Sequence, residues 1–212
     1  MADTLNRLLE TGVVAIIRAD VATGLVEAGR ALARGGVEAI EVTMTTPGAL
    51  EAVEELAAES GGQFIVGSGS VLDAETARAC ILAGAEFLVM PTTDLETIEL
   101  ARRYSKVVCP GALSPTEVIT AWQAGADIVK VFPASLGGPP YLKALKGPLP
   151  QVRLMPVGGV SPENAGEYVE AGACAVALGS ALVNTARIEA EDWDAIEEAA
   201  RRTVQAVQAA RQ

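Results

Sequence analysis

Short apolar segments recur along the chain, and each is followed by a stretch with apolar residues at helical spacing. Short runs rich in valine and isoleucine are typical of buried strands, and apolar positions three and four residues apart predict amphipathic helices. The expected strands lie at 12–18, 38–43, 63–67, 86–90, 106–109, within 126–134, and at 152–157 and 173–178. The expected helices lie at 3–10 and 21–34, from 47, at 73–83, after 94, from 114, from 161 and at about 189–211.

Several boundaries carry their own signals. Gly35 and Gly36 predict the end of the helix at 21–34, and Pro47 suits the first turn of the next helix. Residues 114–117 (SPTE) have the spacing of a capping box. Residues 137–140 (GGPP) are interpreted as part of a connection rich in glycine and proline. Lys143 and Lys146 are expected to lie in the same connection.

Strands that alternate with helices predict a parallel sheet with right-handed crossovers. Eight such units predict one α/β domain over residues 1–212, a (β/α)8 TIM barrel preceded by a lead-in helix. An open doubly wound sheet is the alternative, although no Gly-x-Gly-x-x-Gly pattern follows the first strand.

Composition excludes several classes of function. A net charge of -11 argues against nucleic acid or an anionic membrane as the main partner. The N-terminus has no signal-peptide core and no apolar run could span a bilayer, so a cytoplasmic location is expected. The three cysteines are far apart and predict neither a disulfide framework nor a zinc site. The sequence contains no histidine, so proton transfer must use carboxylate, lysine, hydroxyl, thiol or water.

Lys130 interrupts a short apolar segment that predicts a buried strand. Burial of an ammonium group is costly unless it is paired, and the usual relief is a lowered pKa that leaves a neutral, nucleophilic amine. Alternation places Ile128, Lys130 and Phe132 on one face of the strand, which would be the interior of a barrel. The alternative is a lysine whose stem packs along the barrel while its head reaches an open end.

Further candidates lie where other strands end. Glu41 is expected to face the interior and to meet Lys130, either as a simple ion pair or as the proton-transfer partner of a Schiff-base nucleophile. Glycines follow the last two strands, where TIM barrels commonly bind phosphate; the alternative is two ordinary glycine turns. Arg18, at the end of the first strand, could bind a substrate carboxylate or could simply be solvated.

Five segments together resemble the 2-keto-3-deoxy-6-phosphogluconate (KDPG) and 4-hydroxy-2-oxoglutarate (KHG) aldolases. They are 36–43 (GVEAIEVT), 66–71 (VGSGSV), 109–117 (CPGALSPTE), 129–134 (VKVFPA) and 157–160 (VGGV), and the resemblance extends over about residues 12–185. It implies a metal-independent class I aldolase without a cofactor, usually a homotrimer. Such an enzyme reversibly cleaves a 2-keto-4-hydroxy acid, a small and usually phosphorylated molecule, to pyruvate and an aldehyde, as in the Entner–Doudoroff pathway.

By this resemblance Lys130 forms the Schiff base and Glu41 acts as general acid and base. The remaining positions implied to contact substrate are Arg18, Thr43, Thr45, Ser70, Pro91, Phe132, Gly158, Gly159, Gly179 and Ser180, of which the last four match the phosphate end. Two departures bear on the substrate. Many members have arginine at the position of Thr45, a charge that Arg18 is expected to replace, and Val157 stands where threonine is usual, which removes a hydroxyl donor.

The leading hypothesis is reversible cleavage of KDPG to pyruvate and glyceraldehyde 3-phosphate. The alternatives within the class are the galactonate epimer of KDPG and unphosphorylated 4-hydroxy-2-oxoglutarate. A hypothesis from another class is a phosphosugar-binding or cage-forming barrel without catalysis. Covalent modification of Lys130 by pyruvate and borohydride would distinguish the enzyme from the binding protein.

Overall fold

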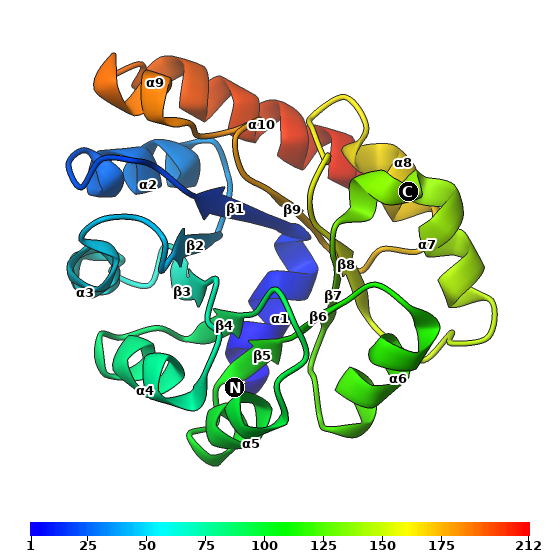
Figure 1. Ribbon diagram of the computed structural model, residues 1–212. Helices are drawn as coiled ribbons and strands as arrows, with labels where there is room; N and C mark the ends of the chain where they lie inside the picture. The colour runs from blue at the N-terminus through cyan, green and yellow to red at the C-terminus, as the bar shows by residue number, and fades with distance from the viewer.

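The computed structural model describes residues 1–212, apart from the side chain of Ala2. It is an α/β fold in which parallel strands occupy the centre and helices surround them (Figure 1). The strands are β1 (Val13–Ile17), β2 (Ala39–Thr43), β3 (Ile65–Gly69), β4 (Phe87–Val89), β5 (Val107–Cys109), β6 (Gly111–Ala112), β7 (Val129–Val131), β8 (Leu154–Pro156) and β9 (Val176–Leu178).

The strands form a six-stranded parallel sheet, in the order β5-β4-β3-β2-β1-β9, and a three-stranded parallel sheet, in the order β6-β7-β8. The larger sheet curls around the centre of the molecule (Figure 1). A parallel bridge between Val157 and Ala177 joins the end of β8 to β9. The register places Glu41 beside Ile16 of β1, and it places Lys130 beside Gly111 of β6. Both residues lie at the middle of their strands, and both line the cavity described below.

Helices from α2 onward surround the strands, whereas α1 lies at the centre of the view, inside this ring (Figure 1). The helices are α1 (Ala2–Thr11), α2 (Leu25–Arg34), α3 (Ala49–Glu59), α4 (Ala74–Leu82), α5 (Leu95–Arg103), α6 (Pro115–Gln123), α7 (Gly138–Lys146), α8 (Ala165–Glu170), α9 (Thr185–Glu189) and α10 (Trp193–Ala209), with a 3-10 turn η1 (Ala134–Leu136). The capping box predicted at Ser114 and Glu117 is present at the start of α6. In the part of the chain that the structure describes, no helix has the length and apolar character to cross a membrane.

The structure corrects one predicted connection and the starts of four predicted helices. Residues 137–140 belong largely to α7, because prolines are tolerated in a first helical turn where no N–H donor is needed. Pro47 precedes α3 and does not begin it, since Gly48 holds the N-cap with φ 69°. Likewise α2 starts only after Gly24, with φ 75°, and α8 starts at Ala165, after a turn that contains Ser161. The terminal helix predicted from about residue 189 is α10, which starts only at Trp193 after the N-cap Asp192, and a separate short helix, α9, precedes it.

Two apolar clusters separate the inside of the strand layer from its outside. The inner cluster contains Val14, Phe87, Ile128 and Met155, whereas the outer one fills the space between strands and helices. Leu8 of α1 belongs to the inner cluster, so α1 covers the amino ends of the strands. The opposite ends of the strands carry the polar and charged side chains described next.

Candidate active site

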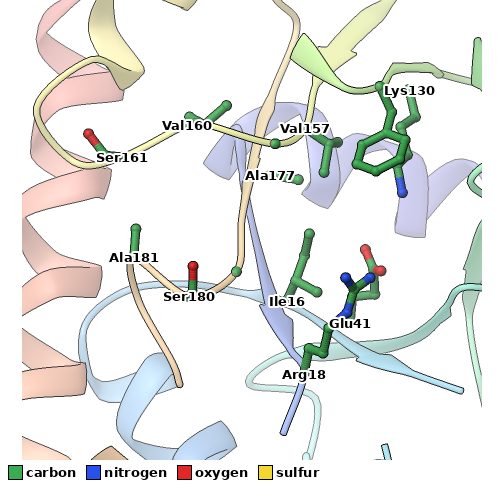
Figure 2. Close-up of a pocket in the computed structure, with 14 residues that line it drawn as sticks. Ile16, Arg18, Glu41, Lys130, Val157, Val160, Ser161, Ala177, Ser180 and Ala181 are labelled. Carbon is green, nitrogen blue, oxygen red and sulfur yellow. The ribbon is translucent and has the colours of Figure 1, made fainter. Parts of the chain in front are cut away.

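A cavity of about 500 Å³ lies at the carboxyl ends of β1, β2, β7, β8 and β9 (Figure 2). Its lining includes eight of the predicted site residues, namely Arg18, Glu41, Lys130, Phe132, Gly158, Gly159, Gly179 and Ser180. The remaining lining residues are Ile16, Val157, Val160, Ser161, Ala177 and Ala181. The structure thus brings together groups from both sheets that are far apart in the sequence.

Lys130 is the amine of this cavity. It lies in the middle of β7, 4% exposed, with Nζ 4.7 Å from the centre of the Phe132 ring. The predicted alternation is confirmed, because Ile128 and Phe132 contact the inner cluster while Val129 and Val131 belong to the outer one. Burial lowers the pKa of Lys130; the negative charge of Glu41 opposes this shift and the positive charge of Arg18 adds to it.

Glu41 is the carboxyl group that faces this amine. It is 1% exposed at the inner side of β2, and Figure 2 shows its carboxylate, the Arg18 guanidinium and the Lys130 ammonium directed into the same space. Burial raises the pKa of Glu41 against the opposing charges of Lys130 and Arg18. Among the described residues, Glu41 Oε2 has no hydrogen-bond partner. A buried acceptor without a partner is costly, so this oxygen is available to a bound ligand.

Two glycines of β3 make space for groups on the inner side of the strands. A Cβ at Gly69 would overlap the Glu41 carboxylate, whereas a Cβ at Gly67 would overlap the ring of Phe87, deeper in the inner cluster. Neither glycine has a positive φ, so the requirement at both positions is space and not backbone conformation. The absence of a side chain at Gly69 is therefore what lets Glu41 occupy its place.

We expect this pair of glycines to separate activity from stability. Gly69→Ala should displace the Glu41 carboxylate and lower kcat about 10- to 100-fold, because small misplacements of a reacting group are expensive. Gly67→Ala should instead lower the free energy of unfolding by about 1–3 kcal/mol through overpacking against Phe87, with kcat of the folded enzyme preserved. Steady-state kinetics and denaturant unfolding of both variants check this; equal kcat values in the two variants would contradict it.

Four predicted substrate-contacting residues lie outside the described lining of the cavity. Ser70 accepts a hydrogen bond from Arg18 Nη2 at 3.3 Å, and so it orients the arginine. Thr43 is buried, and its hydroxyl lies 3.1 Å from those of Thr45 and Thr46. These hydroxyls stabilise the turn after β2. The fourth residue is Pro91, whose backbone carbonyl packs against Gly111. A Cβ on residue 111 would overlap this carbonyl.

The far end of the cavity is formed by backbone. Gly158 and Gly159 have φ values of 90° and 77°, a conformation that other residues adopt at a cost. Figure 2 shows Val160 and Ser161 on one side of this end and Ser180 and Ala181 on the other, away from Lys130. Exposed amides and small side chains around a space of this kind suit an anionic group.

Sequence reasoning missed five of the lining residues. Ile16 and Ala177 lie on interior positions of β1 and β9, which strand alternation could have indicated. Val160, Ser161 and Ala181 lie in the two glycine loops that the sequence indicates as the phosphate end, although only the glycines and Ser180 were singled out there as contacts. Val157, singled out from the sequence as a departure from the family, is 5% exposed and lines the wall of the cavity.

A buried amine with a lowered pKa, facing a buried carboxyl group in a cavity open to small molecules, is typical of enzymes that form Schiff bases with carbonyl compounds. The comparisons with known proteins identify the family. A model of the KDPG and KHG aldolase family matches residues 5–199. The chain therefore belongs to the KDPG and KHG aldolase family.

Two curated relatives illustrate the range of the family. The chain is 37% identical over 148 residues, 69% of this chain and 72% of the relative, to a 2-dehydro-3-deoxy-6-phosphogalactonate aldolase of Escherichia coli. It is 33% identical over 204 residues, 96% of this chain and 91% of the relative, to a 2-dehydro-3-deoxy-phosphogluconate aldolase of Pseudomonas aeruginosa.

Solved structures agree with this assignment. KDPG aldolase from Legionella pneumophila, with pyruvate captured as a covalent carbinolamine, has a TM-score of 0.85 and 28% identity, covering 92% of this chain and 96% of that one. The aldolase of Zymomonas mobilis with 3-phosphoglycerate has a TM-score of 0.84 and 28% identity, with 94% of each chain covered. A cube-shaped cage designed by fusing symmetric oligomeric domains has a TM-score of 0.87 and 31% identity, covering 94% of this chain and 73% of that one.

Proposed function

We propose that this protein is a class I aldolase that reversibly cleaves a phosphorylated 2-keto-3-deoxy sugar acid, with Lys130 as the Schiff-base nucleophile. The observation that carries this proposal is the pair formed by Lys130 and Glu41 inside the cavity: a buried amine with a lowered pKa and a buried carboxyl group with a raised one. The carbinolamine reported for the Legionella relative supports the same covalent chemistry.

The proposed reaction begins when neutral Lys130 Nζ attacks the keto carbon and forms a carbinolamine. Protonated Glu41 gives its proton to the departing hydroxyl, which leaves as water, and a positively charged imine remains. The Glu41 carboxylate then takes the proton of the 4-hydroxyl group. The C3–C4 bond breaks, its electron pair passes into the imine to form an enamine, and the aldehyde departs. Protonation of C3 and hydrolysis of the imine release pyruvate and restore the amine.

Other residues would hold the two ends of the substrate. Arg18, oriented by Ser70, would bind the carboxylate next to the keto group; this is supported by its guanidinium, which shares the space of Glu41 and Lys130 (Figure 2). The glycine loops after β8 and β9 would bind a terminal phosphate, as the 3-phosphoglycerate bound by the Zymomonas relative suggests. Phe132 would cover the reacting carbons between these ends.

Two epimers compete as the natural substrate. KDPG remains the leading candidate, because relatives that act on it match nearly the whole chain. One observation favours the galactonate epimer: Val157 presents an apolar wall where a threonine is usual, and the relative named for this epimer shows 37% identity. Loss of a hydroxyl donor changes which hydroxyl orientation of the substrate the wall can accept.

Pyruvate release from the pure enzyme tests the proposed function. The two phosphorylated epimers and plain 4-hydroxy-2-oxoglutarate should be compared by kcat/KM. We expect both phosphorylated acids to exceed the plain acid by at least about 10-fold, because only they reach the backbone amides at the far end. Turnover of none of the three, with no covalent pyruvate adduct on Lys130, would favour a phosphosugar-binding or cage-forming protein instead.

We also infer that the chain forms a single closed barrel and that the barrel assembles into a homotrimer. A single (β/α)8 barrel over residues 1–212 is supported by the bridge between Val157 and Ala177 and by the one residue, Pro110, that separates β5 from β6. A homotrimer is supported by the oligomeric domains of the related designed cage. Sedimentation analysis of the purified chain would test the oligomeric state.

A further inference from the structure

Two asparagines hold the loops at the far end of the cavity in the same way. Asn164 Nδ2 donates to the carbonyl oxygen of Gly159 at 2.9 Å, while its Oδ1 accepts from Ser161 N at 2.8 Å. Asn184 Nδ2 donates to the carbonyl oxygen of Ser180 at 3.3 Å, and its Oδ1 accepts from Arg187 N at 3.0 Å, where it caps α9. Each asparagine thus fixes one backbone carbonyl of a cavity loop.

Fixing a carbonyl also fixes the amide that follows it. A trans peptide unit is planar, and its C=O and N–H groups point in opposite directions. The hydrogen bond of Asn164 therefore sets the direction of the Val160 N–H, and that of Asn184 sets the direction of the Ala181 N–H. Val160 and Ala181 both line the cavity and lie on opposite sides of its far end (Figure 2). Within the described residues, neither amide has a hydrogen-bond acceptor.

We propose that Asn164 and Asn184 are positioning residues that aim the Val160 and Ala181 amides at the phosphate of the substrate. This inference rests on the proposed function, and it adds which side chains preorganise the anion-binding end. Without either asparagine the loop amide could rotate away from the anion, and binding would then have to restrain it again. The reacting carbons lie at the other end, beside Lys130, so the chemistry itself should be unaffected.

The test uses Asn164→Ala and Asn184→Ala in the full-length enzyme. For a phosphorylated substrate, each variant should lower kcat/KM about 10-fold, mostly through KM, since one hydrogen bond to a charged group would be weakened. For the unphosphorylated keto acid, kcat/KM should change less than about twofold, because that substrate does not use these amides. The inhibition constant of inorganic phosphate should rise in parallel. A merely structural role would reduce activity with both substrates equally.

Two controls make the outcome decisive. Asn6→Ala makes the same chemical change on the exposed surface of α1 and should leave every constant unaltered. Asn184→Ser keeps an N-cap for α9 but lacks the amide donor, so it carries the test if an alanine variant does not fold. An unchanged ratio between phosphorylated and plain substrates would overturn the inference. Failure of pyruvate to modify Lys130 in the wild type would instead overturn the proposed function.

Discussion

Lys130→Met should abolish aldol cleavage, with kcat reduced at least about 10⁴-fold, because no other amine can form the imine. Pyruvate and borohydride should add one reduced pyruvyl group to the wild-type protein, mapped to Lys130 by mass spectrometry, and none to the variant. The adduct should form faster as the pH rises, with a midpoint below the ordinary lysine pKa of 10.5, since burial lowers the pKa of Lys130.

The loss of activity in Lys130→Met should not come from unfolding. A base whose pKa is lowered by folding contributes stability that is complete above its ordinary pKa of 10.5 and is lost as the pH falls through the lowered pKa, so protonation of the buried amine lowers the free energy of unfolding. Methionine has similar length and no charge, and the variant should unfold at the same or a higher denaturant concentration. Lys143→Met, on the exposed face of α7, is the matched control and should keep full activity. A Lys130→Met enzyme that still turned over would refute the Schiff-base mechanism.

Glu41→Gln should lower kcat about 10²- to 10⁴-fold, because glutamine cannot act as the general acid in dehydration or as the general base in C–C cleavage. Pyruvate should still modify Lys130, although more slowly. The charge of Glu41 raises the pKa of Lys130, so its removal should shift the midpoint of adduct formation to lower pH. Single-turnover and trapping measurements over a pH series would separate these effects.

The same substitution should change how stability depends on pH. Burial raises the pKa of Glu41 in the folded protein, so the folded state binds this proton more tightly than the unfolded chain. The stabilising contribution is complete below the ordinary pKa of 4.5 and is lost as the pH rises through the raised value. Glu41→Gln should therefore gain stability relative to the wild type as the pH rises. Glu38→Gln, which alters a carboxylate paired with Arg7 outside the cavity, is the control. A difference that shrinks with rising pH would contradict the assignment.

The sequence by itself determined much of the strand layer and the chemistry of its centre. Alternation in β2 and β7 predicted that Glu41 and Lys130 face inward, and the structure confirms both, because an apolar strand can bury a charged side chain only on the face where a cavity receives it. The capping box could also be predicted, because it depends only on Ser114 and Glu117, which are three residues apart in the chain. Signals of this kind are local in the chain.

Only the tertiary structure decided what depends on distant segments. The fold brings Ser70 within hydrogen-bond distance of Arg18 and packs the Glu41 carboxylate against Gly69. It also brings Asn164 and Asn184 to the backbone carbonyls of the loops at the far end of the cavity. Proline and glycine at the start of α7 predicted a connection, yet packing of Leu142 and Leu145 against the outer cluster favours a helix. Contacts between segments far apart in the sequence leave no periodic trace in either one, so their partners become known only when the chain is folded.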